Sequence, residues 1–179
     1  MTVPTEPRPF SQVPATGISI LERREIEARI VGPLIRALCD ELGSESALAL
    51  VRRVIQRLGE ESGTELAKDL GEASLDAFAK GLERWRRNGA LEIEVIEHTA
   101  DRYSFNVTRC RYAEMYQALG MRDLGGALSC QRDHALIDGF NPNIKLTRTQ
   151  TIMEGKSFCD FRFTMAASPA PAGETTPKT

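Results

Sequence analysis

Large apolar residues in the first part of the chain recur with the spacing of an α-helix. Between residues 18 and 42 they return at every fourth position, at Ile26, Ile30, Leu34, Leu38 and Leu42. Residues three and four apart lie on one face of a helix, so this pattern predicts a helix with one apolar face. The Gly32-Pro33 pair lies inside the segment and predicts a kink or a break there.

Two more helices are expected before residue 90. The second can be capped by Ser44 or Ser46, and its apolar positions are Ala47, Leu50, Val51, Val54, Ile55 and Leu58. The glycines that follow predict a broken helix over residues 59–71. The third helix can be capped by Ser74 and ends at the Asn88-Gly89 pair.

After Gly89 the apolar period changes to two, which is typical of strands. A hairpin is expected over residues 91–108, with its turn at residues 98–101. Helices are expected at residues 112–119 and from about residue 124 to residue 137, followed by strands at residues 144–153 and 158–163. This order predicts an α+β fold. N-terminal helices are followed by two antiparallel β-hairpins that are separated by helices, and all of them pack as one helix-on-sheet domain.

The two ends of the chain differ in composition from this body. Residues 1–17 hold four prolines and lack a basic segment followed by an apolar one, so we expect a flexible arm and no secretory signal. Residues 166–179 hold three prolines and no large apolar residue, which indicates a disordered tail. The expected organisation is therefore an arm (1–17), one α+β domain (18–165) and a tail (166–179).

Charge and composition narrow the classes of partner. Lys and Arg total 23 and Asp and Glu total 25, for a net charge of −2, and this balance argues against a nucleic-acid partner. No stretch approaches the roughly 18 apolar residues of a membrane span. Four cysteines without an export signal favour a cytoplasmic protein with reduced or metal-bound thiols. The apolar face of the first helices could bury against a second copy, which would give a homo-oligomer.

Three of the four cysteines, Cys110, Cys130 and Cys159, are the unusual feature of the second half. Their spacings match no zinc finger or zinc ribbon. Free cysteine is often simply a small buried apolar residue. That interpretation is strong for Cys159, on a strand with two phenylalanines, and for Cys39 on the first helix. It is weaker for Cys110, because strand alternation places it beside polar residues.

Cys130 is the nucleophile that the local sequence favours. Asp133 lies three residues further, on the same face if the segment is helical, and could act as a general base or orient water. A solvent-facing Asp133 is an equally good interpretation from position alone. A thiolate needs a nearby cation, which Arg132 or Arg148 could supply. A Cys130–His134 pair at i and i+4 is a further alternative.

Several motifs together resemble the L-2-amino-thiazoline-4-carboxylic acid hydrolase family. They are FNVTRCRYAE (105–114), CQRD (130–133), Arg148-Thr149 and the terminal CDFRF (159–163). The resemblance extends over roughly residues 20–165 and implies hydrolysis of a small cyclic, nitrogen-containing ring at a C–N bond. It also implies functional roles for Cys110, Cys130, Asp133, Cys159 and Asp160. His134 lies outside this pattern.

From these motifs we expect Cys130 and Asp133 to act in catalysis with Cys110 and Cys159. We expect Asp160, Arg148 and Asn106 to contact the substrate, with no cofactor.

Two alternatives remain open at this point. In the first, Cys110, Cys130 and Cys159 bind Zn²⁺, which activates a water molecule. In the second, the domain binds a small ligand without catalysis. The segment from Gly155 through Cys159 to Phe161 also resembles the end of 4-vinyl-reductase-like sensory domains, which carry a cysteine-bound zinc. One cysteine expected there is Ile152 in this chain.

Overall fold

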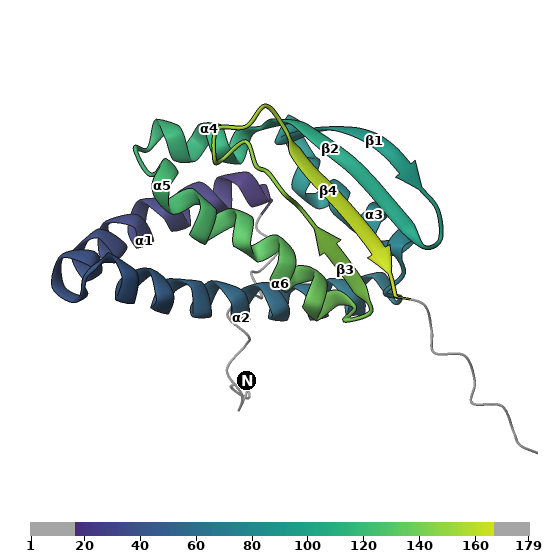
Figure 1. Cartoon of the computed structure of the whole chain (residues 1–179), viewed down its shortest axis with the longest axis horizontal. Helices are drawn as coiled ribbons and strands as arrows, with labels where there is room; N and C mark the ends of the chain where they lie inside the picture. Colours follow the sequence, from purple (N-terminus) through teal and green to yellow (C-terminus); the bar gives the residue numbers. More distant parts are fainter. Residues whose placement is uncertain (1–16, 167–179) are drawn as a thin grey trace, which may run out of the picture.

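The computed structural model describes residues 17–166 (Figure 1). The predicted arm (1–17) and the predicted tail (166–179) lie almost entirely outside the described residues. Within the described part, the order of elements is the predicted one: helices, a hairpin, helices and a second pair of strands. The α+β expectation is confirmed, with helices packed against a single sheet.

The sheet has four antiparallel strands in the order β1-β2-β4-β3. The strands are β1 (Leu91–His98), β2 (Arg102–Cys110), β3 (Ile144–Thr147) and β4 (Cys159–Met165). The strand predicted over residues 144–153 ends at Thr147, because the backbone N–H groups of Thr149 and Gln150 donate to the Asp160 carboxylate rather than to a neighbouring strand. Residues 148–158 therefore form a loop that leads back to β4.

The described residues also form six α-helices. They are α1 (Ile20–Leu42), α2 (Ser44–Leu70), α3 (Leu75–Arg86), α4 (Arg111–Ala118), α5 (Arg122–Gly125) and α6 (Gln131–Phe140). A short 3₁₀ segment (Arg87–Gly89) follows α3, and a π-helical turn (Gly126–Cys130) joins α5 to α6. The single helix predicted near residues 124–137 is thus divided into three segments. In Figure 1, α1 and α2 form a long hairpin that extends away from the sheet.

The predicted break in the second helix is wrong, because α2 runs unbroken from Ser44 to Leu70. Its glycines serve close packing instead. A Cβ atom on Gly63 would lie 2.0 Å from the carbonyl oxygen of Leu136 on α6, and one on Gly139 would lie 2.0 Å from the carbonyl oxygen of Glu60. Only glycine lets the two helix backbones approach this closely. Helix α1 likewise continues through Pro33, so the sequence pair there does not break it.

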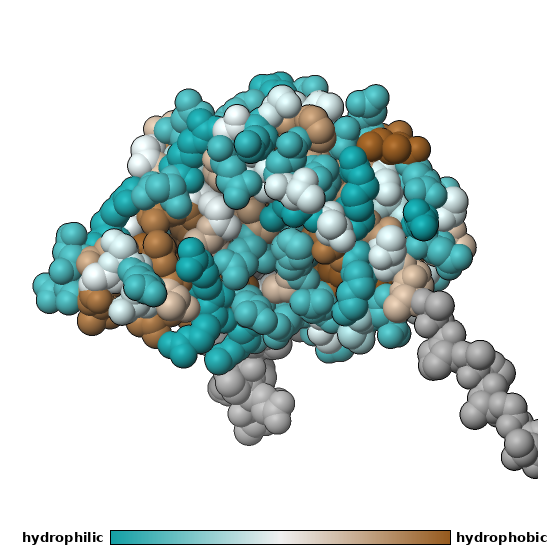
Figure 2. Space-filling view, viewed as in Figure 1, coloured by the Kyte–Doolittle hydropathy of each residue, from teal (hydrophilic) through white to brown (hydrophobic). Residues whose placement is uncertain are grey.

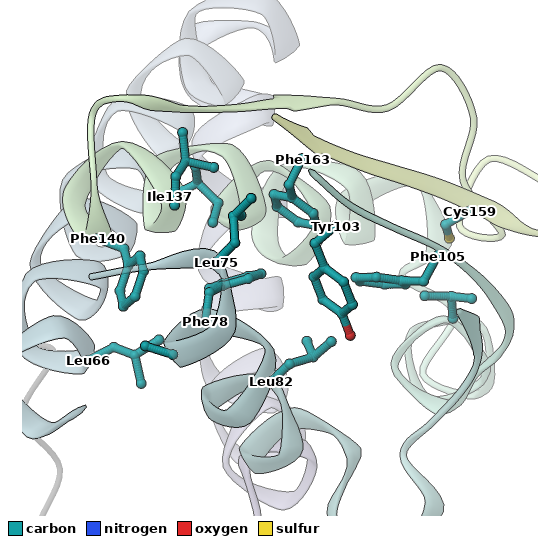
Figure 3. Close-up of a cluster of buried hydrophobic side chains, with 13 residues drawn as sticks. Leu66, Leu75, Phe78, Leu82, Tyr103, Phe105, Ile137, Phe140, Cys159 and Phe163 are labelled. Atoms are coloured by element: carbon teal, nitrogen blue, oxygen red, sulfur yellow. The ribbon is translucent and has the colours of Figure 1, made fainter. Parts of the chain in front are cut away.

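The main core lies between α3, α6 and one face of the sheet (Figure 3). Its centre is aromatic: Phe78 lies 4.9 Å from Phe163 and 5.6 Å from Phe140, measured between ring centroids. Cys159 belongs to this cluster and lies at its Phe105 end. A second cluster joins α1 and α2 to α4 and α5.

The apolar residues that predicted the first helix do not face either core. The residues Ile26, Ile30, Leu34, Leu38 and Leu42, here called the apolar row, are 40–63 % exposed. Helix α1 instead buries Arg24, Ala28, Gly32 and Ile35. Apolar residues gather on the surface at the end of the molecule where α1 and α2 meet (Figure 2). None of the described helices is both long enough and apolar enough to cross a membrane.

Candidate functional site

A cavity of about 130 Å³ lies between the sheet and the helices α2, α3 and α6. Its walls are largely aromatic and aliphatic, with a small set of groups that can carry chemistry. Those groups include Cys110, Cys130, Asp133, Arg148 and Cys159. The fold therefore brings together five of the seven residues that the sequence predicted, from segments up to 49 positions apart.

Strand geometry explains how Cys110 and Cys159 reach the cavity. Cys159 begins β4 and faces the same side of the sheet as Phe161 and Phe163. Cys110 reaches that side through a β-bulge: Leu91 pairs with Cys110 and Ile93 pairs with Val107, so β2 has one extra residue at this point. A bulge shifts the alternation by one position. The prediction that Cys110 lies on the polar face is therefore wrong.

The helical segment that follows α5 positions Cys130 and Asp133. Cys130 ends the π-helical turn, and Asp133 lies in the first turn of α6. Both side chains line the cavity. A π-helical turn redirects side chains relative to a regular α-helix and is frequent at functional sites.

Arg148 comes from the loop after β3 and fixes these groups in place. Its Nη1 donates a hydrogen bond to an oxygen of the Asp133 carboxylate, and its Nη2 donates to the carbonyl oxygen of Cys130 at 3.0 Å. The guanidinium also lies over the ring of Phe161, 5.0 Å from its centroid. The Arg148 side chain is only 8 % exposed, whereas that of Asp133 keeps 39 % of its surface. We infer that Arg148 positions Asp133 and leaves a carboxylate face open to the cavity.

The surroundings of Asp133 raise its pKa from the ordinary value of 3.8. Burial is the main cause, because a carboxylate loses hydration there, and the charge and hydrogen bond of Arg148 act in the opposite direction. A carboxyl group with a raised pKa is a stronger base than an ordinary one, which suits it to accepting and returning a proton. Next to it, burial and the charge of Arg148 lower the pKa of His134, which therefore favours the neutral imidazole.

All three cavity thiols are held in the protonated form at neutral pH. Burial raises the pKa of Cys130, and the Asp133 carboxylate raises it further. Burial raises the pKa of Cys110 to about 11, while the backbone N–H of Ala113 at the start of α4 acts against this rise. The pKa of Cys159 is also raised by burial, although its Sγ accepts a hydrogen bond from the Ile152 N–H at 3.2 Å. A thiol here needs a base to become a nucleophile.

Asp160 and Asn106 are not among the residues that line the cavity. They are register partners in β2 and β4, on the face of the sheet that points away from Phe105 and Phe161. The Asp160 carboxylate accepts hydrogen bonds from Thr149 and Gln150, and the Asn106 Oδ1 accepts one from Arg162 at 2.9 Å. Asp160 thus holds the loop that carries Arg148 through its hydrogen bonds with Thr149 and Gln150.

A group of basic residues lies beside the cavity. Arg132 on α6 is one of the two cations that the sequence suggested, whereas Arg23 and Arg24 on α1, which also reach the cavity, were not predicted. Arg24 is only 7 % exposed. The signal for Arg24 was the spacing of four that it shares with Ala28 and Gly32, which marks the buried face of α1. The larger residues of the apolar row lie on the opposite face of α1, and this face was the one that the apolar spacing identified.

The zinc alternative required Cys110, Cys130 and Cys159 to form a ligand set. Across residues 17–166 no group of three or more His, Cys, Asp or Glu side chains is arranged to hold a metal ion. The three thiols share the cavity without forming such a set, so we derive no step through zinc.

Comparisons with known proteins bear on both fold and family. The family model described as L-2-amino-thiazoline-4-carboxylic acid hydrolase matches residues 23–163. No curated protein sequence matches the chain.

Two of the solved structures that match the chain have the following degrees of similarity to it. Trafficking protein particle complex subunit 3 from Naegleria fowleri, solved with covalently bound palmitic acid, has a TM-score of 0.50 and 10 % identity over 82 % of this chain and 96 % of its own. The phenol-responsive sensory domain of the transcription activator PoxR, solved with phenol, has a TM-score of 0.45 and 18 % identity, covering 75 % of this chain and 72 % of its own.

Proposed function

Because the chain belongs to the L-2-amino-thiazoline-4-carboxylic acid hydrolase family, we propose that it hydrolyses a small cyclic amidine or thiazoline-like ring, at a C–N bond and without a cofactor. One observation carries the proposal: a single cavity is lined by thiols, by a carboxylate of raised pKa and by the arginine that orients it. The cavity volume of about 130 Å³ suits a ring. A dry apolar cavity of about 150 Å³ accommodates one benzene molecule.

In the mechanism that we propose, Cys130 is the nucleophile and Asp133 is its general base. Asp133 accepts the thiol proton as Sγ bonds to the amidine carbon, and the C=N electron pair moves to nitrogen. Asp133 then returns the proton to the ring nitrogen. The lone pair of the other amidine nitrogen forms a new C=N bond as the ring C–N bond breaks, and Asp133 passes a proton from that nitrogen to the departing one, which leaves as an amine. The opened chain is left joined to Cys130 through sulfur.

Water completes the reaction at the same carbon. Asp133 accepts a proton from the water as its oxygen bonds to that carbon, and the bond to Sγ then breaks. The proton returns to the sulfur, so the thiol is restored and the net change is the addition of one water. Cys110 and Cys159 line the same cavity and are proposed to complete the catalytic set by shaping it around the ring. The reduced thiols that this chemistry needs fit a cytoplasmic protein.

Mass spectrometry of a panel of cyclic amidines, lactams and thiazolines tests the activity. We expect one class of ring to gain the mass of one water in the presence of the protein. Cys130→Ala should abolish this gain, and Cys39→Ala is the matched control, since Cys39 packs in the second core cluster away from the cavity. A thiazoline product that carries a new free thiol would contradict cleavage at the C–N bond.

A second candidate function is small-ligand binding without catalysis. The observation that favours it is the protonated state of all three thiols in a mostly apolar cavity. Stabilisation against heat by a ring compound that is never turned over would support this function and contradict hydrolysis.

The apolar row supports a proposal about partners, namely a second copy of this chain. If two copies of α1 crossed antiparallel at Leu34, Arg29 of one copy would approach the acidic Asp40–Glu41 end of the other. This arrangement would cover large apolar side chains that are otherwise in water. A sedimentation experiment that finds only monomers at micromolar concentration would contradict it.

A further inference from the structure

A second hollow, of about 300 Å³, opens between α1 and α2 next to the thiol-lined cavity. Its walls are mainly aliphatic and include Val31, Ile55 and Leu58. Both hollows share Arg23, Arg24, Ser62 and Arg132 as lining residues. The three arginines therefore stand at the junction of the two hollows, and the proposed hydrolysis uses none of them.

The junction carries more positive than negative charge. Three guanidinium groups surround one carboxylate, that of Glu27. Arg24 Nη1 donates to both Glu27 oxygens, at 2.9 and 2.7 Å. Arg23 Nε and Arg132 Nη2 each lie 3.7 Å from a Glu27 oxygen, which is beyond ordinary hydrogen-bond distance. The four side chains together have a formal charge of +2.

Two of these arginines retain unused hydrogen-bonding capacity. Arg23 Nε is buried and has no hydrogen-bond partner in the structure. Arg132 Nε donates to the carbonyl oxygen of Leu128, and the Arg132 side chain is 15 % exposed. Burial, followed by the nearby charge of Arg24, lowers the pKa of Arg132 to about 10, so the group is still charged at neutral pH. Like charges gathered out of water are unfavourable unless an anion compensates them.

We propose that Arg23, Arg24 and Arg132 form an anion-binding site that takes the acid group of a ligand. The group is a carboxylate or a phosphate, the two anions that the planar guanidinium matches through paired hydrogen bonds. With the anion at the junction, a ring on one side of it lies in the thiol-lined cavity. A substituent on the other side lies in the aliphatic hollow, so the ligand can be larger than the ring alone.

As a statement about the substrate, this inference rests on the proposed function, because it assigns a binding site to an acid group on the ring that is opened. As a statement about binding, it is independent of catalysis. Equilibrium binding is therefore the appropriate test, and it can be made in Cys130→Ala as well as in the natural sequence. Anion binding without turnover would contradict the hydrolase and leave the anion site intact.

The probes are benzoate and benzamide, two rings of similar size that differ in charge, together with inorganic phosphate. Isothermal titration calorimetry should show benzoate binding at least about tenfold more tightly than benzamide, since only benzoate offers the guanidinium groups an anion and charge-assisted hydrogen bonds are stronger than neutral ones. Tighter binding of phosphate than of benzoate would identify a phosphate ligand, and the reverse order would identify a carboxylate. Both orders support the site.

Variants locate the site. Arg132→Gln should lower the affinity for benzoate about tenfold or more, and Arg132→Lys should recover part of it. The matched control is Arg29→Gln, which removes an exposed arginine of α1 that pairs with Glu25 and is not among the lining residues of either hollow. If Arg132→Gln does not fold, Arg23→Gln takes its place, because its side chain is more exposed and its Nε makes no hydrogen bond.

Three results would overturn the proposal. They are equal affinities for benzoate and benzamide, no binding of either anion, and a loss of benzoate affinity in Arg29→Gln as large as that in Arg132→Gln.

Discussion

The two ends of helix α2 are packed in opposite ways. Towards residue 70, α2 meets α6 through glycines, so closely that a Cβ atom on Gly63 would overlap the backbone of α6. Towards residue 44, α2 turns back to α1, whose apolar row stays exposed. The α6 end is packed backbone against backbone and forms a wall of the cavity. At the α1 end, large apolar side chains of α1 remain exposed to solvent. The difference shows that close backbone packing fixes the cavity end, while the far end keeps an exposed apolar surface, which is the surface that the proposed second copy would cover.

The largest expected effect is on catalysis at the cavity end. Asp133→Asn should lower kcat/KM by about 10²- to 10⁴-fold, the usual contribution of general acid–base catalysis. Burial raises the pKa of Asp133, so the acidic limb of the natural enzyme's pH–rate profile should lie above pH 3.8. Arg148 opposes that rise. Arg148→Met should therefore move the limb to still higher pH, and a limb that moves to lower pH would contradict the assignment of Asp133.

The close helix contact gives the next largest effect. In Gly63→Ala the added Cβ would lie 2.0 Å from the Leu136 carbonyl oxygen and 2.6 Å from the Phe140 nitrogen, both of them backbone atoms. We expect the free energy of unfolding to fall by about 3 kcal/mol or more in urea denaturation, because neither helix can move aside without disturbing the core. Gly126→Ala is the control, since nothing lies within 4 Å of its Cβ position. Equal stability of the two variants would show that the helices can separate.

Asp160 holds the loop that carries Arg148, and removing the Asp160 carboxylate should have a moderate effect on stability. Asp160→Ala removes a carboxylate that accepts hydrogen bonds from Thr149 and Gln150, and should cost about 1–2 kcal/mol of stability at neutral pH. Burial raises the pKa of Asp160, but these hydrogen bonds together outweigh it and lower the pKa below 3.8. The carboxylate therefore stabilises the fold above its unfolded pKa and ceases to do so as the pH falls through its lowered folded pKa. Urea unfolding at neutral pH and at pH 3 should show the difference between natural protein and variant shrinking.

The smallest effect on folding is expected at the far end. Leu34→Ser replaces a side chain that is 59 % exposed, so the stability of the single subunit should change by no more than about 0.5 kcal/mol. Self-association should weaken, however, because Leu34 is central to the apolar row. Analytical ultracentrifugation measures the proportions of single subunits and of associated subunits. Ile35→Ser is the matched comparison at the neighbouring buried position, where stability itself should fall.

The same contrast explains what sequence patterns could and could not predict. Period-two alternation located β1, β2 and β4, because each strand has one face against the core. The apolar row predicted a helix correctly. It did not identify the buried face of that helix, because the residues that α1 buries include Arg24, Ala28 and Gly32, which do not belong to the row. Glycines in α2 indicated a break when considered locally. Their actual purpose is contact with α6, which is 75 or so positions away and leaves no local signal.

The candidate site was predictable to a similar extent. Motif resemblance selected the thiols, Asp133 and Arg148, and the fold brings these groups to one cavity. Asp160 and Asn106 belong to the same motifs, but strand alternation turns them to the opposite face of the sheet. The bulge at the end of β2, which turns Cys110 inward, has no counterpart in the apolar pattern. The arginine junction depends on contacts between α1 and α6, and so could be found only in three dimensions.

A crystal structure of Cys130→Ala grown with a ring compound that the natural protein opens would test the central claim most directly. We expect the ring in the thiol-lined cavity, with its amidine carbon about 3–3.5 Å from the position that Sγ would occupy and the Asp133 carboxylate within hydrogen-bond distance of a ring nitrogen. A ring bound elsewhere on the protein, with this cavity empty at saturating concentration, would contradict the account.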